Sequence, residues 1–373
     1  MTRSEYRLAS ALLRLLAIVF RLLPLPSGQV VLATARQARL EGNLAYIHAA
    51  LRRLHPSQRV VLLLEPYGYG LRAKLAYLLR VIRGMYHLQK ARLFVVDNAY
   101  LPIHVAAHPA STTVVQVWHA VGAMKRFGVD TTLPPSEPEL TFLHRNYDHV
   151  VVSSEPTRVP VAAALRTPVE RVLALGTPRT DFFFDERPMA VARERILRDY
   201  PDIAGRRVVL YAPTFRGRGR QRTAAGSLDA ARLRAALPPD YVLLLKGHPT
   251  LDPRLGDRTG FDVVIDPKLD INELLTLTDI LVTDYSSSVF EWALLRRPLI
   301  LLVADLEEYE RDPGLYLDFR SEMIGTQATS TDGVIEAILE DRFNPSGYGA
   351  FIERHLGACD GQASDRFVRH FLG

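Results

Sequence analysis

Residues 280–291 read ILVTDYSSSVFE, and this stretch decides the fold. Its first four residues, Ile280–Thr283, form a short apolar run that is typical of a strand buried in a parallel sheet. Three serines follow, and the spacing of the next apolar residues predicts a helix. A strand that leads through a polar turn into a helix is the repeating unit of an α/β fold, in which ligands bind at the carboxyl ends of the strands.

The same alternation extends along most of the chain. Apolar runs predict strands at Gln29–Ala33, Val60–Leu64, Leu93–Val96, Thr113–Trp118, His149–Val152, Val208–Tyr211, Tyr241–Lys246, Val263–Asp266, Ile280–Thr283 and Leu299–Val303. Helical patterns separate them, among others at Asn43–Leu54, Leu71–Gly84, Asp229–Ala236, Ile271–Thr276 and Val289–Leu295. We therefore predict an α/β chain with two Rossmann-like domains, residues 27–186 and 187–345, facing a central cleft, between an N-terminal helix (1–26) and a C-terminal helical segment (346–373).

Composition excludes several classes of protein. The chain has 373 residues, of which 48% are hydrophobic and 23% charged, so disorder and simple fibres are excluded. A net charge of +5 is compatible with an anionic ligand or an anionic membrane surface and does not require nucleic acid. The single cysteine, Cys359, excludes an internal disulfide and a cysteine-based zinc site.

The N-terminal residues 8–25 are strongly apolar but are interrupted by Arg14 and Arg21. On a helix these two share one face with Arg3 and Arg7. A membrane-spanning helix would place Arg14 near the middle of the bilayer, which costs about 2.5–3.5 kcal/mol. We expect instead an amphipathic helix in the membrane interface, with its arginines beside anionic headgroups. A signal peptide and a core-packing helix with a solvated arginine face are the alternatives.

Ser286, Ser287 and Ser288 lie where the predicted helix begins. The first turn of a helix presents unpaired N–H groups and the positive end of the helix dipole, and the serine hydroxyls add further donors, so this segment predicts a phosphate-binding site. Capping the helix would require only one serine. Glu291, one turn later, could accept hydrogen bonds from ribose hydroxyls or could equally be a solvated helix residue.

Lys246 and His248 follow the strand Tyr241–Lys246. Both can contact a diphosphate, and the histidine can donate a proton to a leaving phosphate. A single histidine at the end of a strand is more often structural. The neighbouring lysine favours function, because only five of the 46 basic residues are lysines. Thr214 and Arg216, after the strand Val208–Tyr211, could also meet phosphate.

His119 follows a strand of the first domain, so we expect it on the opposite wall of the cleft from His248. With an unperturbed pKa of about 6.5, it can act as a base near neutral pH. Gly122 permits close approach of the backbone, and the two cations after it can hold an anionic acceptor. The residues expected on the acceptor side are Gly122, Lys125, Arg126 and Arg179.

Five motifs, in this order, resemble those of the CDP-glycerol glycerophosphotransferase family, the group of wall teichoic acid primases and polymerases. They are Trp118-His119 with Lys125, Gly176-x-Pro178-Arg179-x-Asp181, Tyr211-Ala-Pro213-Thr214-x-Arg216, Lys246-x-His248-Pro249 and Thr283-Asp284-Tyr285-Ser286-Ser287. Residues 361–366 also resemble the family's closing segment. The chain departs from the family at residues 120–122, where the family usually has Gly-Thr/Val-Pro, close to the acceptor side.

The resemblance implies a GT-B fold and a peripheral enzyme on the inner face of the membrane. The donor would be CDP-glycerol or a similar CDP-polyol, bound by the second domain. The acceptor would be a saccharide or polymer linked to undecaprenyl diphosphate, and CMP would be released. By carry-over, His119 is the catalytic base and His248 a second essential histidine beside the donor diphosphate. Ser286, Ser287, Asp284 and Glu291 would belong to the donor site, with Glu291 near the ribose.

Metal use and reaction type are left open by the residues. The sequence has no metal-binding cluster, but Mg²⁺ bound through the donor phosphates remains compatible with it. A GT-B glycosyltransferase would share the fold and the phosphate site, and differs only in its nucleotide-sugar donor. A nucleotide-sugar 2-epimerase and a non-enzymatic membrane scaffold are further alternatives. The N-terminal helix argues against the epimerase, and the two histidines argue against the scaffold.

Overall fold

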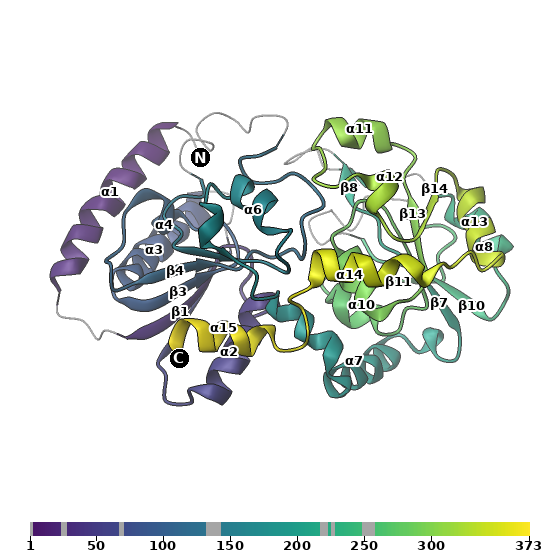
Figure 1. Ribbon diagram of the computed structural model, residues 1–373, viewed down its shortest axis with the longest axis horizontal. Coiled ribbons are helices and arrows are strands. Elements are labelled where there is room, and N and C mark those ends of the chain that lie inside the picture. The colour runs from purple at the N-terminus through teal and green to yellow at the C-terminus, as the bar shows by residue number, and fades with distance from the viewer. Residues whose placement is uncertain are drawn as a thin grey trace. The chain divides into compact units, whose positions relative to one another are not determined.

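The computed structural model describes residues 3–23, 28–66, 71–131, 143–216, 223–224, 228–247 and 258–373. The chain divides into two compact units (Figure 1). Unit 1 comprises residues 1–181 and 355–373, and unit 2 comprises residues 182–354. The chain therefore leaves unit 1, completes unit 2, and returns to unit 1 with its last helix.

Unit 1 is built on a parallel sheet that has six strands among the described residues, in the order β2-β1-β3-β4-β5-β6. The strands are β1 (Gln29–Thr34), β2 (Val60–Leu64), β3 (Ala91–Val96), β4 (Thr113–Gln116), β5 (His149–Val151) and β6 (Val172–Leu173). The helices are α1 (Arg3–Leu22), α2 (Gly42–Leu54), α3 (Leu71–Leu88), α4 (Leu101–Val105), α6 (Arg158–Ala164) and α15 (Ala363–Leu372). Because β1 lies between β2 and β3, the direction of strand addition reverses at β1, as in doubly wound sheets.

The core of unit 1 joins segments from both ends of the chain. Leu44, Ile47 and Leu51 of α2 pack with Phe367 and Val368 of α15 over the strands. Asp181 accepts the backbone N–H groups of Ala363 and Ser364, at 2.9 and 2.8 Å, and so fixes the start of α15. Helix α15 is therefore an integral part of unit 1.

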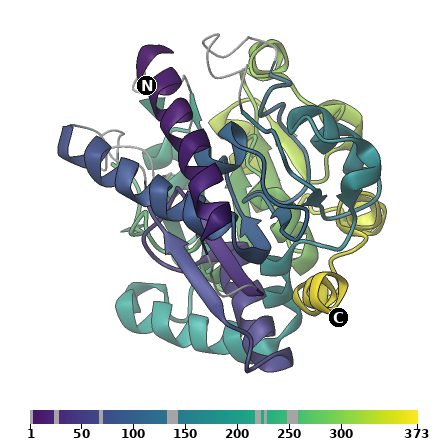
Figure 2. The same cartoon turned by 90° about the vertical axis from the view of Figure 1, so that its left-hand side faces the viewer.

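Helix α1 packs against α3 and α4 on unit 1 (Figure 2). Its inner face buries Ser10, Leu13 and Ala17. Nε of Arg14 donates to the carbonyl of Val105 at 2.8 Å, and Arg21 donates to Gln89 and to the carbonyl of Ala107. These two arginines thus bind unit 1, which differs from the expectation that they project toward a membrane.

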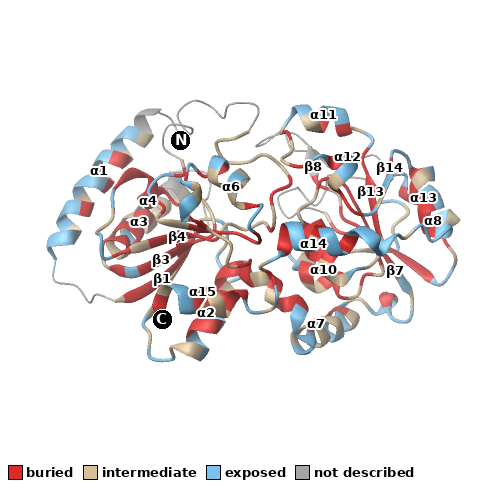
Figure 3. Ribbon diagram, in the orientation of Figure 1, coloured by how far each residue is buried: buried red, intermediate tan, exposed pale blue. Residues whose placement is uncertain are grey.

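The outward face of α1 is apolar. Figure 3 shows exposed residues along α1. The large hydrophobic residues among them are Leu8, Leu12, Leu15, Ile18, Val19 and Leu22. Leu75 and Leu79 of α3 are also exposed. Among the described residues, no helix is both long enough and apolar enough to cross a membrane.

Unit 2 repeats the architecture with a parallel sheet that has six strands among the described residues, in the order β11-β10-β7-β12-β13-β14. These strands are β7 (Arg207–Tyr211), β10 (Tyr241–Leu245), β11 (Val263–Val264), β12 (Ile280–Thr283), β13 (Leu299–Leu302) and β14 (Thr326–Ala328). A separate antiparallel pair joins β8 (Phe215–Arg216) to β9 (Thr223–Ala224). The helices are α7 (Glu186–Asp199), α8 (Ala230–Ala236), α9 (Ile271–Leu275), α10 (Ser288–Leu295), α11 (Leu306–Arg311), α12 (Phe319–Glu322), α13 (Thr331–Leu339) and α14 (Tyr348–Leu356).

Helices cover the sheet of unit 2 through alternate residues of its strands. Leu233 of α8 and Val334 of α13 pack on one set, which includes Val209 and Leu243. The polar turn of residues 284–287 connects β12 to α10, so the serines stand at the carboxyl edge of this sheet. The prediction of two Rossmann-like α/β halves is confirmed.

Candidate functional site

His119 lies in the loop that follows β4, at the carboxyl edge of the sheet in unit 1. The backbone of Trp118 is left-handed, with φ of 50°, which turns the chain directly before His119. The Trp118 indole stacks on Phe127, with ring centroids 4.9 Å apart, and lies 4.3 Å from the His119 ring. The aromatic contacts hold this strained turn in place.

The protonation state of His119 follows from its neighbours. Nδ1 is 3.2 Å from the carbonyl oxygen of Asp97, which can only accept, so Nδ1 carries the hydrogen and Nε2 keeps its lone pair. The side chain keeps some exposure, but the protein around its ring removes most of its hydration. This desolvation, followed by the nearby charge of Arg36 and Arg179, lowers the pKa of His119 to about 3. The imidazole is therefore neutral at physiological pH.

Asn43 and Arg179 hold the His119 loop by its backbone carbonyls. The buried side-chain amide of Asn43 donates to the carbonyls of Val117 and Trp118, at 3.2 and 3.0 Å. Its oxygen accepts the backbone N–H of Arg179 at 3.0 Å, and the Arg179 guanidinium donates to the carbonyl of His119 at 3.0 Å. Arg179 thus lies against the His119 loop. Asn43 was missed, because no local motif marks it.

The other acceptor-side residues follow in the same loop. Gly122 adopts φ of 64°, a left-handed conformation that glycine tolerates without strain. Lys125 is half-buried. Arg126 pairs with Asp130 at 3.5 Å. The structure therefore brings His119, Gly122 and these cations onto one loop of unit 1.

Lys246 stands at the carboxyl end of β10 in unit 2. It is buried, and Nζ donates to the carbonyl of Pro267 at 3.0 Å. Burial lowers the pKa of Lys246 to about 8, against the opposing effect of Asp270 and Asp266. The ammonium is therefore held where burial makes its charge costly, and this cost exceeds the favourable effect of the two aspartates.

The serines begin α10 as predicted. The Ser286 hydroxyl accepts the backbone N–H of Ser288 at 3.3 Å and lies 2.8 Å from the Ser288 hydroxyl. Ser287 makes no side-chain cap hydrogen bond. Ser286 therefore caps the helix, and the half-exposed Ser287 is the hydroxyl that local capping does not use.

The remaining donor-side residues have different surroundings. Asp284 accepts both the backbone N–H and the hydroxyl of Thr214, at 2.9 and 3.0 Å, so these two residues tie the end of β7 to the end of β12. Glu291 is fully buried in α10, which excludes the alternative of a solvated helix residue. The Arg216 backbone lies in β8, whereas its side chain and all of His248 lie outside the described residues.

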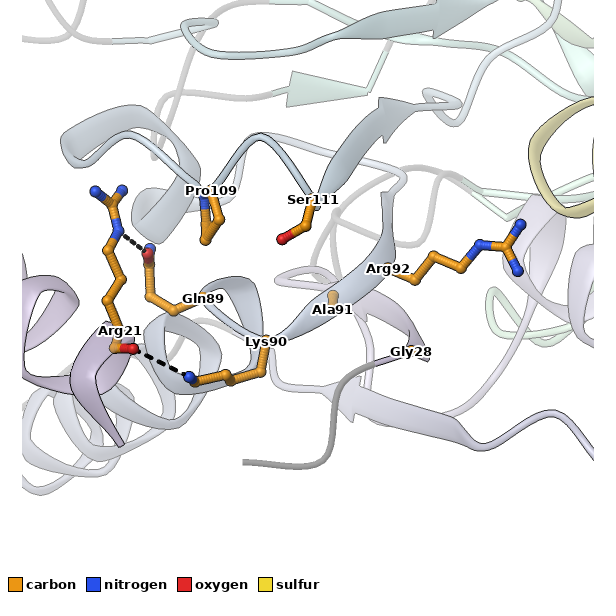
Figure 4. A pocket seen from close by; sticks show the side chains of 8 residues that line it. All are labelled: Arg21, Gly28, Gln89, Lys90, Ala91, Arg92, Pro109 and Ser111. Atoms are coloured by element: carbon orange, nitrogen blue, oxygen red, sulfur yellow. Dashed lines mark hydrogen bonds between the residues drawn. The ribbon is translucent and has the colours of Figure 1, made fainter. Parts of the chain in front are cut away.

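A pocket of about 530 Å³ lies near α1, beside the first residue of β3 (Figure 4). Its lining residues are Arg21, Gly28, Gln89, Lys90, Ala91, Arg92, Pro109 and Ser111. It lies at the amino ends of the strands, the opposite edge from His119, and holds none of the predicted site residues. In the described part of the chain, no group of three or more His, Cys, Asp or Glu side chains could hold a metal ion.

Two parallel sheets with polar residues at their carboxyl edges define a GT-B-like class of fold, and solved structures agree. The wall teichoic acid polymerase TagF, in its H548A form, matches with a TM-score of 0.75 and 18% identity, over 96% of this chain and 92% of that chain. This likeness shows the fold. The family model described as CDP-Glycerol:Poly(glycerophosphate) glycerophosphotransferase matches residues 15–373, and the chain belongs to that family.

Two curated relatives are more similar in sequence. The teichoic acid ribitol-phosphate primase of Bacillus spizizenii is 33% identical, over 94% of this chain and 93% of the relative. The teichoic acid poly(ribitol-phosphate) polymerase of the same organism is 35% identical, over 94% of this chain but only 57% of the relative. The chain thus spans nearly all of one relative and little more than half of the other. The resemblance read from the motifs is confirmed.

Proposed function

We propose that this protein transfers a polyol phosphate from a CDP-polyol to a hydroxyl of a lipid-linked acceptor, with release of CMP, in the synthesis of teichoic acid or a related surface polymer. Membership of the family supports the transfer of a polyol phosphate from a CDP-polyol. The observation that carries the assignment to this site is the hydrogen bond between Nδ1 of His119 and the Asp97 carbonyl, which leaves the lone pair on Nε2.

In the proposed reaction, Nε2 of His119 takes the proton of the acceptor hydroxyl. The acceptor oxygen forms a bond to the outer phosphorus of the donor as the bond from that phosphorus to the CMP oxygen breaks. Such phosphoryl transfer depends mainly on positioning and on neutralisation of charge. The clamp of Asn43 and Arg179 on the His119 loop supports the positioning role.

We assign the donor diphosphate to unit 2, at the start of α10 and beside Lys246. The buried ammonium of Lys246 and the hydroxyl of Ser287, which makes no cap hydrogen bond, support this assignment. His248 and Arg216 remain predictions from the motif resemblance. Whether Mg²⁺ takes part through the donor phosphates is tested by adding a chelator to the transfer assay.

Ribitol phosphate is the first polyol to test. The two relatives described above, at 33% and 35% identity, are both named for ribitol phosphate, whereas the motif resemblance pointed to CDP-glycerol. The primary assay measures CMP release from CDP-ribitol and CDP-glycerol, beside UDP-sugars. The acceptors are a lipid-linked disaccharide and the same lipid carrying one polyol phosphate. We expect CMP release that depends on the acceptor.

A His119→Ala variant is the matched control in this assay. It should lose transfer by about 10²–10⁴-fold, the usual contribution of a general base, with unchanged affinity for the CDP-polyol. Equal loss of binding and rate would contradict the base assignment. Turnover of a UDP-sugar with none of a CDP-polyol would instead establish a glycosyltransferase.

We also propose that α1 docks unit 1 on the inner surface of the cell membrane. The exposed apolar residues along one face of the helix support this role. The lining of the pocket at its C-terminal end adds two further cations, Lys90 and Arg92, and no carboxylate, which suits anionic headgroups. In this arrangement apolar side chains enter the interface, and Arg14 and Arg21 attach the helix to the protein.

A further inference from the structure

Asp97 occupies the position of unit 1 at which ligands of doubly wound sheets bind. It follows β3 directly, at the carboxyl edge, and β3 lies next to β1. The strand order reverses between these two strands, and the crevice at such a switch point is the usual ligand site. Thr34 ends β1 on the other side of this crevice, followed closely by Arg36.

The carboxyl group of Asp97 is buried but incompletely paired. The residue is 4% exposed, and the Thr34 hydroxyl and the backbone N–H of Asp97 itself interact with its side chain. Its oxygen Oδ1 has no hydrogen-bond partner among the described residues. Leaving a buried acceptor without a donor is unfavourable, and more so for a charged group, so such an oxygen calls for an explanation.

The same residue orients the base. The main-chain carbonyl of Asp97 accepts the Nδ1 hydrogen of His119 at 3.2 Å. The backbone of Asp97 thus holds His119 in position, and a group bound by the Asp97 carboxyl lies close to that contact. We propose that Oδ1 of Asp97 accepts a hydrogen bond from a second hydroxyl of a polyhydroxylated acceptor, adjacent to the hydroxyl that gives its proton to His119. This inference rests on the proposed function and names a recognition group for its acceptor.

Other strand-edge carboxylates of this chain show what a structural role looks like. Asp148 accepts the backbone N–H of Val114 at 2.8 Å, at the amino edge of the sheet in unit 1. In unit 2, Asp279 accepts from Val208 at 2.7 Å, and Asp262 accepts from Leu243 at 2.8 Å. Each of these carboxylates satisfies a backbone N–H within the first three residues of a strand. Asp97 lies at the opposite edge and satisfies no such group with Oδ1.

The pH dependence of acceptor use follows from the same surroundings. Burial raises the pKa of Asp97 to about 6, against the opposing effects of the Thr34 hydroxyl and the Arg36 charge. His119, with a pKa of about 3, does not titrate in this range. Above pH 6 the carboxyl is ionised and accepts. Below pH 6 it becomes protonated, and kcat/KM for the acceptor should fall by up to about tenfold per pH unit.

The test compares the full-length Asp97→Asn variant with wild type at saturating CDP-polyol, with the lipid-linked disaccharide that carries one polyol phosphate as the varied acceptor. We expect KM for the acceptor to rise at least about tenfold. We also expect the fall in kcat/KM below about pH 6 to disappear. Donor affinity should not change, and thermal stability should be equal or higher, because an unpaired buried charge is removed. Asp148→Asn is the matched control, which should lose stability and keep the acceptor KM.

A second acceptor, whose terminal polyol lacks the hydroxyl next to the reacting one, sharpens the test. Wild type should discriminate against it by at least about tenfold, and Asp97→Asn should not. Any of three results for the variant would overturn the inference: an unchanged acceptor KM, a fall in kcat/KM below about pH 6 as in wild type, or the same discrimination between the two acceptors.

Acceptor binding without turnover separates this inference from the proposed function. The chain has two tryptophans: Trp118 adjoins His119, and Trp292 is fully buried in α10. Titration of acceptor against Trp118 fluorescence therefore reports binding in unit 1 even if no CDP-polyol is turned over. Weaker acceptor binding in Asp97→Asn supports the inference in that case, and equal binding overturns it.

Discussion

Asn43 serves three backbone groups with one buried side chain. Two carbonyls of the His119 loop and one N–H of Arg179 depend on it. Asn43→Ala should lower the free energy of unfolding by about 2–4 kcal/mol, because these groups lose their partners. It should also lower kcat by about tenfold or more, since the base loses its position, with donor affinity unchanged. Chemical denaturation and steady-state kinetics on one preparation provide both numbers.

Gln58→Ala is the matched control for that variant. The Gln58 amide also donates to two main-chain carbonyls, those of Gly28 and Arg59, but at the amino edge of the sheet. It should cost stability and leave kcat unchanged. Equal loss of kcat in both variants would show that general destabilisation, and not the loop, determines the rate.

The lowered pKa of Lys246 predicts how stability and donor affinity change at alkaline pH. Its pKa in the folded chain is about 8, below the unfolded value of about 10.4, so the unfolded chain binds more protons between these values. The free energy of unfolding should therefore rise with pH across this range in wild type and stay flatter in Lys246→Met. Affinity for the CDP-polyol should fall above pH 8 in wild type, as the ammonium is lost. In the variant it should be weak at every pH.

At the level of elements, two serines at the start of α10 have different roles: Ser286 caps the helix, and Ser287 is assigned to ligand binding. Ser286→Ala should cost about 1 kcal/mol of stability, because the hydroxyl that accepts the Ser288 N–H is lost. Ser287→Ala should leave stability unchanged, because this side chain makes no cap hydrogen bond. It should nevertheless weaken donor binding by roughly tenfold or more, the effect of one hydrogen bond to a charged group.

Ser330, the N-cap of α13, provides the comparison for these serines. Its hydroxyl accepts the Gly333 N–H at 3.3 Å, so Ser330→Ala should lose stability as Ser286→Ala does. Its donor affinity should equal that of wild type. Unchanged donor affinity in Ser287→Ala, measured by calorimetry with the CDP-polyol, would contradict the assignment of the diphosphate to this helix.

At the scale of the whole molecule, the proposed membrane docking depends on a single helix face. Leu15→Glu with Leu22→Glu should abolish flotation with anionic vesicles, because charges would enter the interface. Val191→Glu, at an exposed apolar position of α7, should float like wild type. Vesicles of neutral lipid should bind wild type less than anionic vesicles, because the cationic pocket then lacks its counter-charge. Flotation of the double variant equal to wild type would exclude α1 as the docking element.

Apolar runs predicted most of both sheets from the sequence, and each predicted strand lies within two residues of its observed bounds. The strands β6 and β14 were not predicted, because Val172–Leu173 and Thr326–Ala328 are too short for a pattern and form by pairing with β5 and β13. The predicted ends of the strands were enough to select His119, Lys246 and the serines as candidate site residues. The partners of these residues could not be predicted in the same way. Asn43 lies 74 residues from Val117 in the chain, and only the folded sheet brings them together.

The return of the chain to unit 1 has a consequence during synthesis on the ribosome. Unit 2 is continuous in sequence, so it can fold as soon as residues 182–354 have emerged. Unit 1 begins first but lacks α15, whose Phe367 and Val368 belong to its core. The earlier half must therefore wait, with apolar surface over β1 and α2 uncovered, until the later half has been made. Newly made unit 1 is thus the part of this protein that we expect chaperones to hold longest.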